Sequence, residues 1–242
     1  SEMCIRDRNI KKLIKLMVMS HVYQQKSNSN DKLNEIDPNN FFLARSNSYK
    51  LPAEIIRDNG LASSGLLVKK VGGPSVKPYQ RDGLWLEKNS FSADLYNYKK
   101  NSGDSLYRRG MYTFIKRTSP PPSMIALDGT SREECTVKRE KTNTPLQALV
   151  LMNDPQFFEA SRVLAERIQK EVGGNYSEQI KYGFRLAVSR NPKHEELKLL
   201  NELYESQLKF YKSNPKMTNQ ILKIGDKKFD RSLNKYKTAA NE

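Results

Sequence analysis

The sequence has few of the residues that build metal centres and disulfide frameworks. Its 242 residues include two cysteines, Cys4 and Cys135, and two histidines, His21 and His194. Two cysteines cannot form a multi-disulfide scaffold, a four-cysteine zinc site or a CxxCH haem attachment. Each histidine lies near the end of a predicted helix without a second ligand, so both are interpreted as surface residues. We therefore expect no metal and no cofactor in this chain.

Long apolar segments and familiar catalytic motifs are also missing. No apolar run approaches the roughly 20 residues that cross a bilayer, and no export signal with an apolar core and a small-residue cleavage site appears. The motifs GxSxG, HExxH, GxGxxG and GxxxxGK[ST] are absent. The sequence thus predicts no membrane span, and an enzyme is the weaker interpretation of it.

Basic residues, in contrast, are in large excess. Lysine and arginine number 42 against 27 acidic residues, which gives a net charge of +15 and a pI near 9.7. Such an excess attracts polyanions of any kind, whether nucleic acid, anionic lipid or acidic polysaccharide. The basic residues are spread over predicted helix faces and loops, as on a solvated surface, so nonspecific polyanion or nucleic-acid binding is only the third interpretation.

Apolar periodicity predicts a mainly α fold. In the first part of the chain, apolar residues at helical spacing predict an amphipathic helix over residues 9–24, followed by a polar loop over 25–40. Pro52 is predicted to open a second helix. Its apolar face would be Ile55, Ile56, Ala62 and Leu66. The neighbouring Arg57 and Asp58 are interpreted as an exposed ion pair.

The last hundred residues carry repeated helix-start signals. Polar capping residues followed by proline satisfy the first free amides of a helix and supply its fixed φ. The predicted starts are Thr144–Pro145, Asp154–Pro155, Ser177, Asn191–Pro192 and Pro215.

The middle of the chain is predicted to be irregular and rich in proline and glycine. Residues 71–85 favour turns, with Trp85 and Phe91 as apolar anchors, and residues 107–115 show helical spacing. Three prolines at 120–122 forbid helix continuation. Residues 124–127 and 136–137 are predicted to be the strands of a small β-hairpin.

Both ends look altered. The opening SEMCIRDR resembles translated adapter read-through, so residues 1–8 are predicted to be non-native, and residues 9–242 to be a single helical domain. We expect this domain to be truncated at the C-terminus, as in a metagenomic fragment.

Residues 106–158 hold the candidate site. Guanidinium groups match the oxygens of carboxylates, sulfates and phosphates, and a helix start offers free N–H groups to an anion. The alternative is architectural: the arginines would bond carbonyls and acids of the irregular middle. After prolines and caps are accounted for, the candidate ligand-binding residues are Arg109, Arg117, Asp128, Arg139, Asn143 and Gln147.

Four stretches carry a family resemblance. They are LPAEIIRDNGLASSGLL, GGPSVKPYQRDGLW, the long run from YRRGMYTFIKRTSPPPSMIALDG to MNDPQFFEASRVLAERI, and FRLAVSRNPKHEEL. Together they resemble the C-terminal domain of unknown function in planctomycete-type multidomain cytochrome c proteins, and NIKKLIKLMVMSHVYQQ fits the same family.

The resemblance implies context more than chemistry. It implies a periplasmic or cell-envelope location, an upstream cytochrome c-type domain of the same polypeptide that carries haem c, and a final helix missing here. It supplies no catalytic residue. The main hypothesis is an accessory binding or assembly module that engages anionic polysaccharide; the alternative is a hydrolase or oxidoreductase component acting on such polymers.

Overall fold

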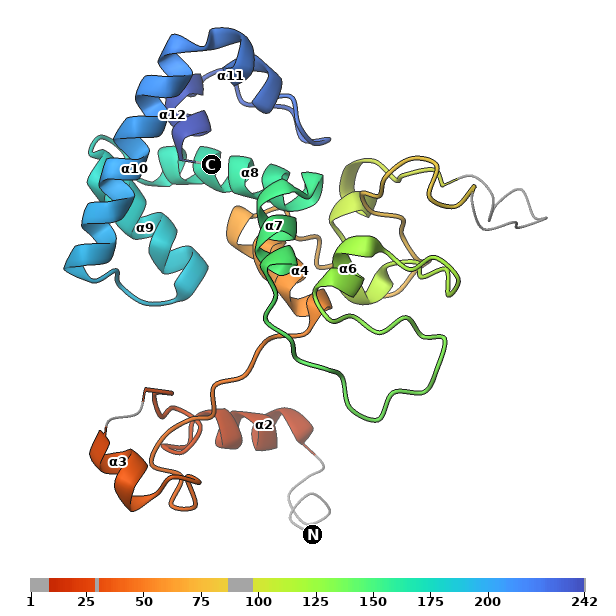
Figure 1. Ribbon diagram of the computed structural model, residues 1–242, viewed down its shortest axis with the longest axis vertical. Coiled ribbons are helices and arrows are strands. Elements are labelled where there is room, and N and C mark those ends of the chain that lie inside the picture. Colours follow the sequence, from red (N-terminus) through yellow and green to blue (C-terminus); the bar gives the residue numbers. More distant parts are fainter. Residues whose placement is uncertain (1–8, 29–30, 87–97, 242) are drawn as a thin grey trace. The chain divides into compact units, whose positions relative to one another are not determined.

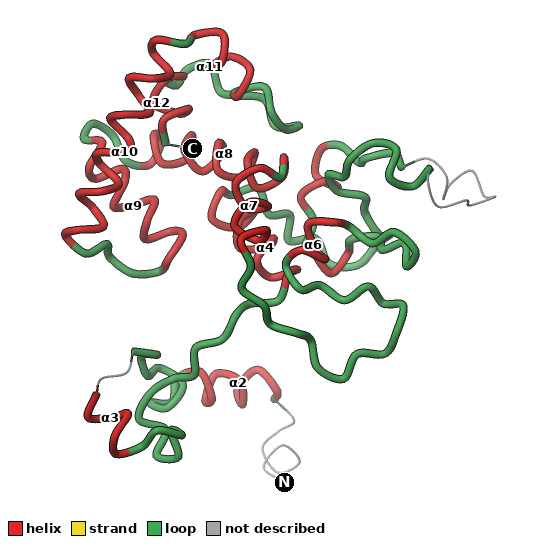
Figure 2. The backbone as a smooth tube through the Cα atoms, in the orientation of Figure 1, coloured by secondary structure: helices red, strands yellow, loops and turns green. Residues whose placement is uncertain are grey.

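The computed structural model describes residues 9–28, 31–86 and 98–241. Ten α-helices lie in these residues, and their only β-pairings are isolated bridges (Figures 1 and 2). The mainly α fold is confirmed. The chain divides into two compact units, residues 1–50 and 51–242, and each is described by itself. The single domain over residues 9–242 stays a prediction.

The N-terminal unit holds two short helices, α2 (Ile10–Val18) and α3 (Asp31–Ile36). Helix α2 is shorter than predicted because the Ser20 hydroxyl donates to the carbonyl of Met17, 2.7 Å away, and the chain turns there. Helix α3 corrects the predicted polar loop. It is followed by buried Asp37, whose carboxylate accepts backbone N–H bonds over 2.8 Å and closes the next turn.

The larger unit is built on two long helices and their neighbours. Its α-helices are α4 (Ala53–Ser64), α6 (Pro122–Ala126), α7 (Pro145–Asn153), α8 (Pro155–Glu171), α9 (Tyr176–Val188), α10 (His194–Ser213), α11 (Pro215–Ile221) and α12 (Lys235–Ala240). Helix α8 packs on α4, α7, α9 and α12, and α10 packs on α9, α11 and α12 (Figure 1). Buried apolar side chains between α4, α8 and the irregular middle form its core, among them Leu61, Leu106 and Phe157.

Several predicted helix starts are confirmed. Helices α7, α8 and α11 begin at prolines 145, 155 and 215. Asp154 caps α8, because its carboxylate accepts the N–H of Gln156 at 2.9 Å. Two starts are shifted: Asn175, not Ser177, caps α9, and α10 begins at His194, after the predicted Asn191–Pro192.

The predicted β-hairpin is wrong. Residues 124–126 belong to α6, Leu127 ends it, and residues 136–137 lie in an exposed loop. The triple proline explains the error, because a proline forbids helix on its N-terminal side but is well suited to a helix's first turn. Pro122 is the first residue of α6.

The predicted helix over residues 107–115 is also wrong. Two 3₁₀ turns replace it, η1 (Gly103–Tyr107) and η2 (Gly110–Tyr112), with an extended Arg108 between them. Backbone bonds to distant segments hold this path: Val68 N–H donates to Tyr107 O at 3.0 Å, and Val76 N–H to Tyr112 O at 2.8 Å. Tertiary pairing therefore overrides local helical spacing. Trp85 is buried as predicted, whereas Phe91 lies outside the described residues.

Only part of the predicted apolar face of α4 packs inward: Leu66, just beyond the helix end, is buried, and Ile56 packs on the core. Ile55 and Ala62 are exposed, and the buried residues of α4 include Ala53, Leu61 and Arg57. Arg57 is 3% exposed, which corrects its interpretation as half of an exposed ion pair. The reason lies in the bonds that this guanidinium makes.

Candidate functional site

Arg57 joins α4 to the irregular middle of the chain. Its guanidinium donates to the carbonyls of Arg108 (2.6 Å) and Leu106 (3.0 Å), and to the side-chain oxygen of Gln156 on α8 (2.9 Å). Irregular backbone leaves carbonyls without a helix or sheet partner, and a buried carbonyl needs a donor. Arg57 is therefore an architectural residue.

Arg108 does the same for the glycine-rich loop that precedes it. It is 5% exposed, donates to Pro74 O at 2.8 Å and also to Gly72 O. Its guanidinium lies 3.8 Å above the centre of the Tyr112 ring, an arrangement that favours a cation. Arg108, which lies within residues 106–158, thus matches the architectural alternative for the arginines of that segment.

Two of the predicted site residues pair with acids one helical turn apart on α4. Arg139 makes a two-pronged bond to Glu54, with N–O distances of 2.7 and 3.0 Å. Arg109 lies 3.8 Å from the carboxylate of Asp58. The hydrogen bond from Arg139 lowers the pKa of Glu54. Both guanidiniums are thus already engaged by carboxylates.

Asp128 and Gln147 form a second, separate group. The Asp128 carboxylate accepts the Thr142 hydroxyl at 2.6 Å, the Thr142 N–H at 2.9 Å and the Gln147 amide at 3.2 Å. Gln147 also accepts the N–H of Thr144 at 3.4 Å, as the capping box of α7. These bonds close the loop of residues 129–141. The structure thus brings two of the six candidate residues, Asp128 and Gln147, into contact, and their bond closes a loop.

The last two predicted residues, Asn143 and Arg117, are exposed. The six predicted residues therefore fall into three groups. Asp128 and Gln147 bond each other, Arg109 and Arg139 pair with acids of α4, and the other two face solvent. We see no common pocket formed by Asp128, Arg139 and Asn143, because Asp128 and Arg139 bond different partners and Asn143 faces solvent.

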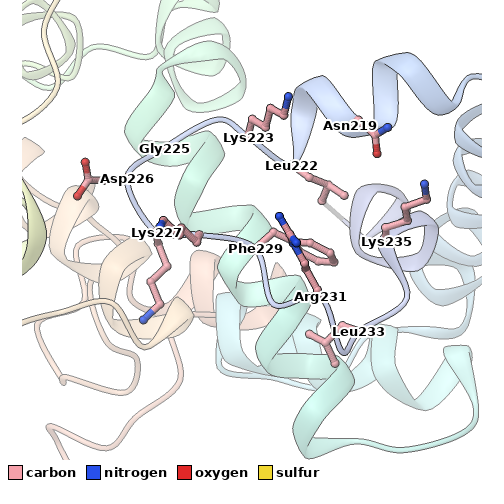
Figure 3. Close-up of a pocket in the computed structure, with 11 residues that line it drawn as sticks. Asn219, Leu222, Lys223, Gly225, Asp226, Lys227, Phe229, Arg231, Leu233 and Lys235 are labelled. Atoms are coloured by element: carbon pink, nitrogen blue, oxygen red, sulfur yellow. The ribbon is translucent and has the colours of Figure 1, made fainter.

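A basic groove lies elsewhere, around the loop that joins α11 to α12. Its cavity measures about 830 Å³. We call it the basic groove; its cations are Lys223, Lys227, Lys228, Arg231 and Lys235. Figure 3 shows Phe229 and Arg231 near its centre, with Leu222 and Leu233 beside them. The site combines positive charge with an aromatic ring, the two features that suit an anionic sugar or polymer.

The one carboxylate that lines the groove is already bonded outside it. Asp226 accepts the N–H of Gly103 at 2.9 Å and lies 3.6 Å from the ammonium of Lys100. In Figure 3 its side chain lies at the far end of the loop from Arg231. Within the described part of the chain, no ion pair engages Lys223, Lys228 or Arg231. The cations of the groove are therefore available to a ligand.

Helix α8 holds the groove loop in place through a buried carboxylate. Glu159 is 0% exposed, and one of its oxygens accepts the backbone N–H groups of Asp226 and Lys227, both at 2.7 Å. The hydroxyls of Tyr107 (2.8 Å) and Tyr79 (2.9 Å) complete its bonding. Burial and the bond to Glu159 raise the pKa of both tyrosines.

Three further α8 residues continue this attachment along the same helix face. Buried Arg162 donates to Lys227 O and pairs with Glu166 one turn on. Glu166 accepts the N–H of Asp230 at 3.3 Å, and Lys170 lies 2.7 Å from the Asp230 carboxylate. Since the loop backbone bonds α8, its lysines can point to solvent.

The basic groove was not predicted from the sequence. The available signal was the run KIGDKKFDRSLNK, with five cations in the segment after the predicted helix start at Pro215. Charge runs of this kind usually mark a solvated surface, so the run alone did not identify a groove. What adds the cavity is Gly225 at φ +99°, which bends the loop over Glu159.

The described residues show neither a metal-binding cluster nor a membrane-spanning helix. They contain no group of three His, Cys, Asp or Glu side chains placed to hold a metal ion. Among the described helices, each is too short or too polar to cross a bilayer.

Comparison with known proteins identifies a family of uncharacterised proteins. The chain matches the PSD1 family, described as protein of unknown function (DUF1553), over residues 1–204, and it belongs to that family. The match includes residues 1–8, whose predicted non-native origin stays a prediction. No curated protein matches the chain, and no solved structure matches it. Residues 205–242, which contribute the basic groove, lie beyond the family match.

Proposed function

We propose that this chain is an accessory binding or assembly module of an exported, multidomain cytochrome c-like protein, and that it binds anionic polysaccharide in the basic groove. The observation that carries the proposal is the set of five cations around a cavity of about 830 Å³ that also contains Phe229. Sulfate and carboxylate groups would meet the lysines and Arg231, and the sugar face would pack on the aromatic ring.

The cellular context of the proposal comes from the resemblance to planctomycete-type cytochrome c proteins. That resemblance implies a periplasmic or cell-envelope module that follows an upstream domain carrying haem c. The full-length gene tests this part: an export signal and a CxxCH motif upstream would support it. A gene with neither would overturn the context and leave the groove to be tested by itself.

Binding is tested by calorimetry with dextran sulfate and neutral dextran. The wild type should bind the sulfated polymer and leave the neutral one unbound. A triple variant, Lys223→Gln, Lys228→Gln and Arg231→Gln, should lose about tenfold or more in affinity, since three charge-assisted contacts disappear. No binding by the wild type would sink the proposal.

A matched control separates the groove from net charge. The exposed lysines of α10 can be changed in the same number, as Lys198→Gln, Lys209→Gln and Lys212→Gln. This variant has the same net charge as the groove variant and should bind dextran sulfate nearly as the wild type does. Equal losses in the two variants, together with similar affinity for DNA and a steep salt dependence, would indicate nonspecific polyanion binding.

The central stretch is the competing location for the same ligand. A variant with Arg109→Ala, Arg117→Ala and Arg139→Ala tests it. We expect nearly unchanged affinity, because two of these guanidiniums already engage carboxylates of α4. A loss confined to this variant would move the site back to the central stretch.

A further inference from the structure

A second cavity, of about 300 Å³, lies where α8, α9, α10 and the end of α12 meet. Its walls are mainly apolar, with Ile168 from α8, Ile180 from α9 and Leu200 from α10 among them. Gly183 lets α9 approach closely, since a Cβ at this position would lie 2.8 Å from Cδ1 of Ile168. The volume falls at the lower end of the range for small-molecule sites.

No charged side chain is among the described residues that line this cavity. An ionised ligand would lose its hydration without gaining a partner of opposite charge, which is costly in an apolar site. We call this cavity the neutral pocket.

Three residues of the lining each carry a buried polar atom that has no hydrogen-bond partner. These atoms are the side-chain oxygen of Gln179, the hydroxyl of Tyr204 and the side-chain nitrogen of Asn241. Gln179 and Tyr204 are each 4% exposed. The Gln179 amide nitrogen donates to Val172 O at 2.9 Å, which leaves its oxygen as the unused acceptor.

Unpartnered buried polar atoms are rare, because each costs the desolvation of a group that gains no bond. Three such atoms belong to residues around one apolar cavity. They supply a hydrogen-bond acceptor on Gln179, a donor on Asn241, and a hydroxyl on Tyr204 that can do either. A carboxamide or hydroxyl on an apolar body would satisfy this set.

We propose that the neutral pocket binds an uncharged, mainly apolar small molecule through one carboxamide or hydroxyl group. The apolar body lies against α8, α9 and α10, and the polar end bonds Gln179, Tyr204 and Asn241. The proposal does not depend on the basic groove, because the two sites share no lining residue.

The experiment uses octanamide as the probe and octanoate as its charged counterpart of equal chain length. Titration of the isotope-labelled protein followed by NMR should show saturable octanamide binding, with shifts gathered on α9 and α10. Octanoate should bind about tenfold or more weakly, because its carboxylate finds no cation. Absent or non-saturable octanamide binding would mean that ordered water alone fills the pocket, and it would overturn the proposal. Equal binding of octanoate and octanamide would overturn it as well.

Two variants test the geometry. Tyr204→Phe should weaken octanamide binding by about threefold or more while keeping or raising Tm, since it removes a hydroxyl that bonds nothing in the free protein. A purely structural tyrosine would give a lower Tm and unchanged affinity.

The second variant, Leu203→Trp, should block the pocket with its larger side chain. Leu199→Trp, one turn away on α10 and outside the lining, is the matched control and should bind octanamide normally. The basic-groove triple variant should also bind octanamide as the wild type does. Equal loss in the two tryptophan variants would overturn the assigned location.

Discussion

Basic side chains have opposite roles in the irregular middle of the chain and in the loop between α11 and α12. Arg57 of α4 and Arg108 of the middle are buried, and both donate to backbone carbonyls of the middle. In the loop, Lys223, Lys228 and Arg231 are exposed around a cavity. Both segments lack regular structure, so irregular backbone alone does not explain the difference.

The difference lies in which side chains hydrogen-bond the backbone groups of each segment. In the middle, the backbone carbonyls are unpaired until arginines reach them, and a guanidinium with five planar donors can bond several at once. In the loop, side chains of α8 take that role through Glu159, Arg162 and Glu166. The loop's own cations are therefore left for solvent or a ligand. The comparison teaches that a basic cluster predicts a binding site only where other groups satisfy the surrounding backbone.

The largest effect is expected from Arg57→Ala. It leaves two buried carbonyls and the Gln156 oxygen without their donor, so the free energy of unfolding should fall by about 3–5 kcal/mol. Urea denaturation measures it. Arg117→Ala, at an exposed position of the irregular middle, should change stability by less than about 0.5 kcal/mol. If Arg57→Ala does not fold, Arg57→Lys can be measured instead. It keeps the positive charge but lacks the planar guanidinium with its several donors, so it should still be clearly destabilised. Similar small effects for Arg57 and Arg117 would contradict the architectural role.

Gly225→Ala should give the next largest effect. Gly225 has a φ of +99°, and a Cβ there would lie 2.3 Å from the carboxyl carbon of Glu159. We expect a loss of about 1–3 kcal/mol from strain and overlap. Dextran sulfate binding should weaken too, because the loop must lift from α8.

Gly173→Ala is the matched control for this prediction. A Cβ at Gly173 meets no atom within 4 Å, and its φ is not in the left-handed range. Stability and binding should therefore stay close to those of the wild type. A harmless Gly225→Ala would show that α8 does not hold the groove loop.

A smaller effect concerns the pH dependence of stability. The bond from Arg139 lowers the pKa of Glu54 below its unfolded value of about 4.3. The pair therefore adds stability above that pH, and the gain is lost as pH falls through the folded pKa. Since Arg139 is partly exposed, the gain should be at most about 1 kcal/mol.

Denaturation of the wild type and Arg139→Ala at pH 7 and pH 3 measures this difference. The two proteins should differ at pH 7, and the difference should become smaller at pH 3. If the difference in free energy of unfolding between the two proteins is as large at pH 3 as at pH 7, Arg139 acts through packing instead.

The smallest change in stability is expected for the basic-groove triple variant. Its three cations form no ion pair within the described residues, and like charges repel. The free energy of unfolding should thus change by less than about 0.5 kcal/mol, or rise slightly. Thermal denaturation measures it. A large loss of stability would show that these cations have a structural role, like Arg57 and Arg108.

Local signals in the sequence predicted much of the helical framework. Proline with a preceding Asp or Thr marked the starts of α7 and α8, because both residues act within the first turn. The same local reasoning failed at residues 107–115, where Val68 and Val76 pair with the backbone from about forty residues away. It also failed for α4, where bonds to Leu106 and Arg108 bury Arg57.

The candidate site was predicted less well than the fold. Asp128 and Gln147 were both candidate ligand-binding residues, but the bond between them closes a loop, and Arg109 and Arg139 engage acids of α4. The basic groove depends on a bond between Glu159 and residues almost seventy positions later in the chain. No local pattern reports such a bond.

The sequence by itself determined the helical class, most helix starts, the excess of positive charge and the family resemblance, because these depend on neighbouring residues or on composition. Tertiary structure decided which cations are buried and which face a cavity. That choice depends on whether a carbonyl, a carboxylate or water lies within reach of each side chain, and distant segments supply these partners only once the chain has folded.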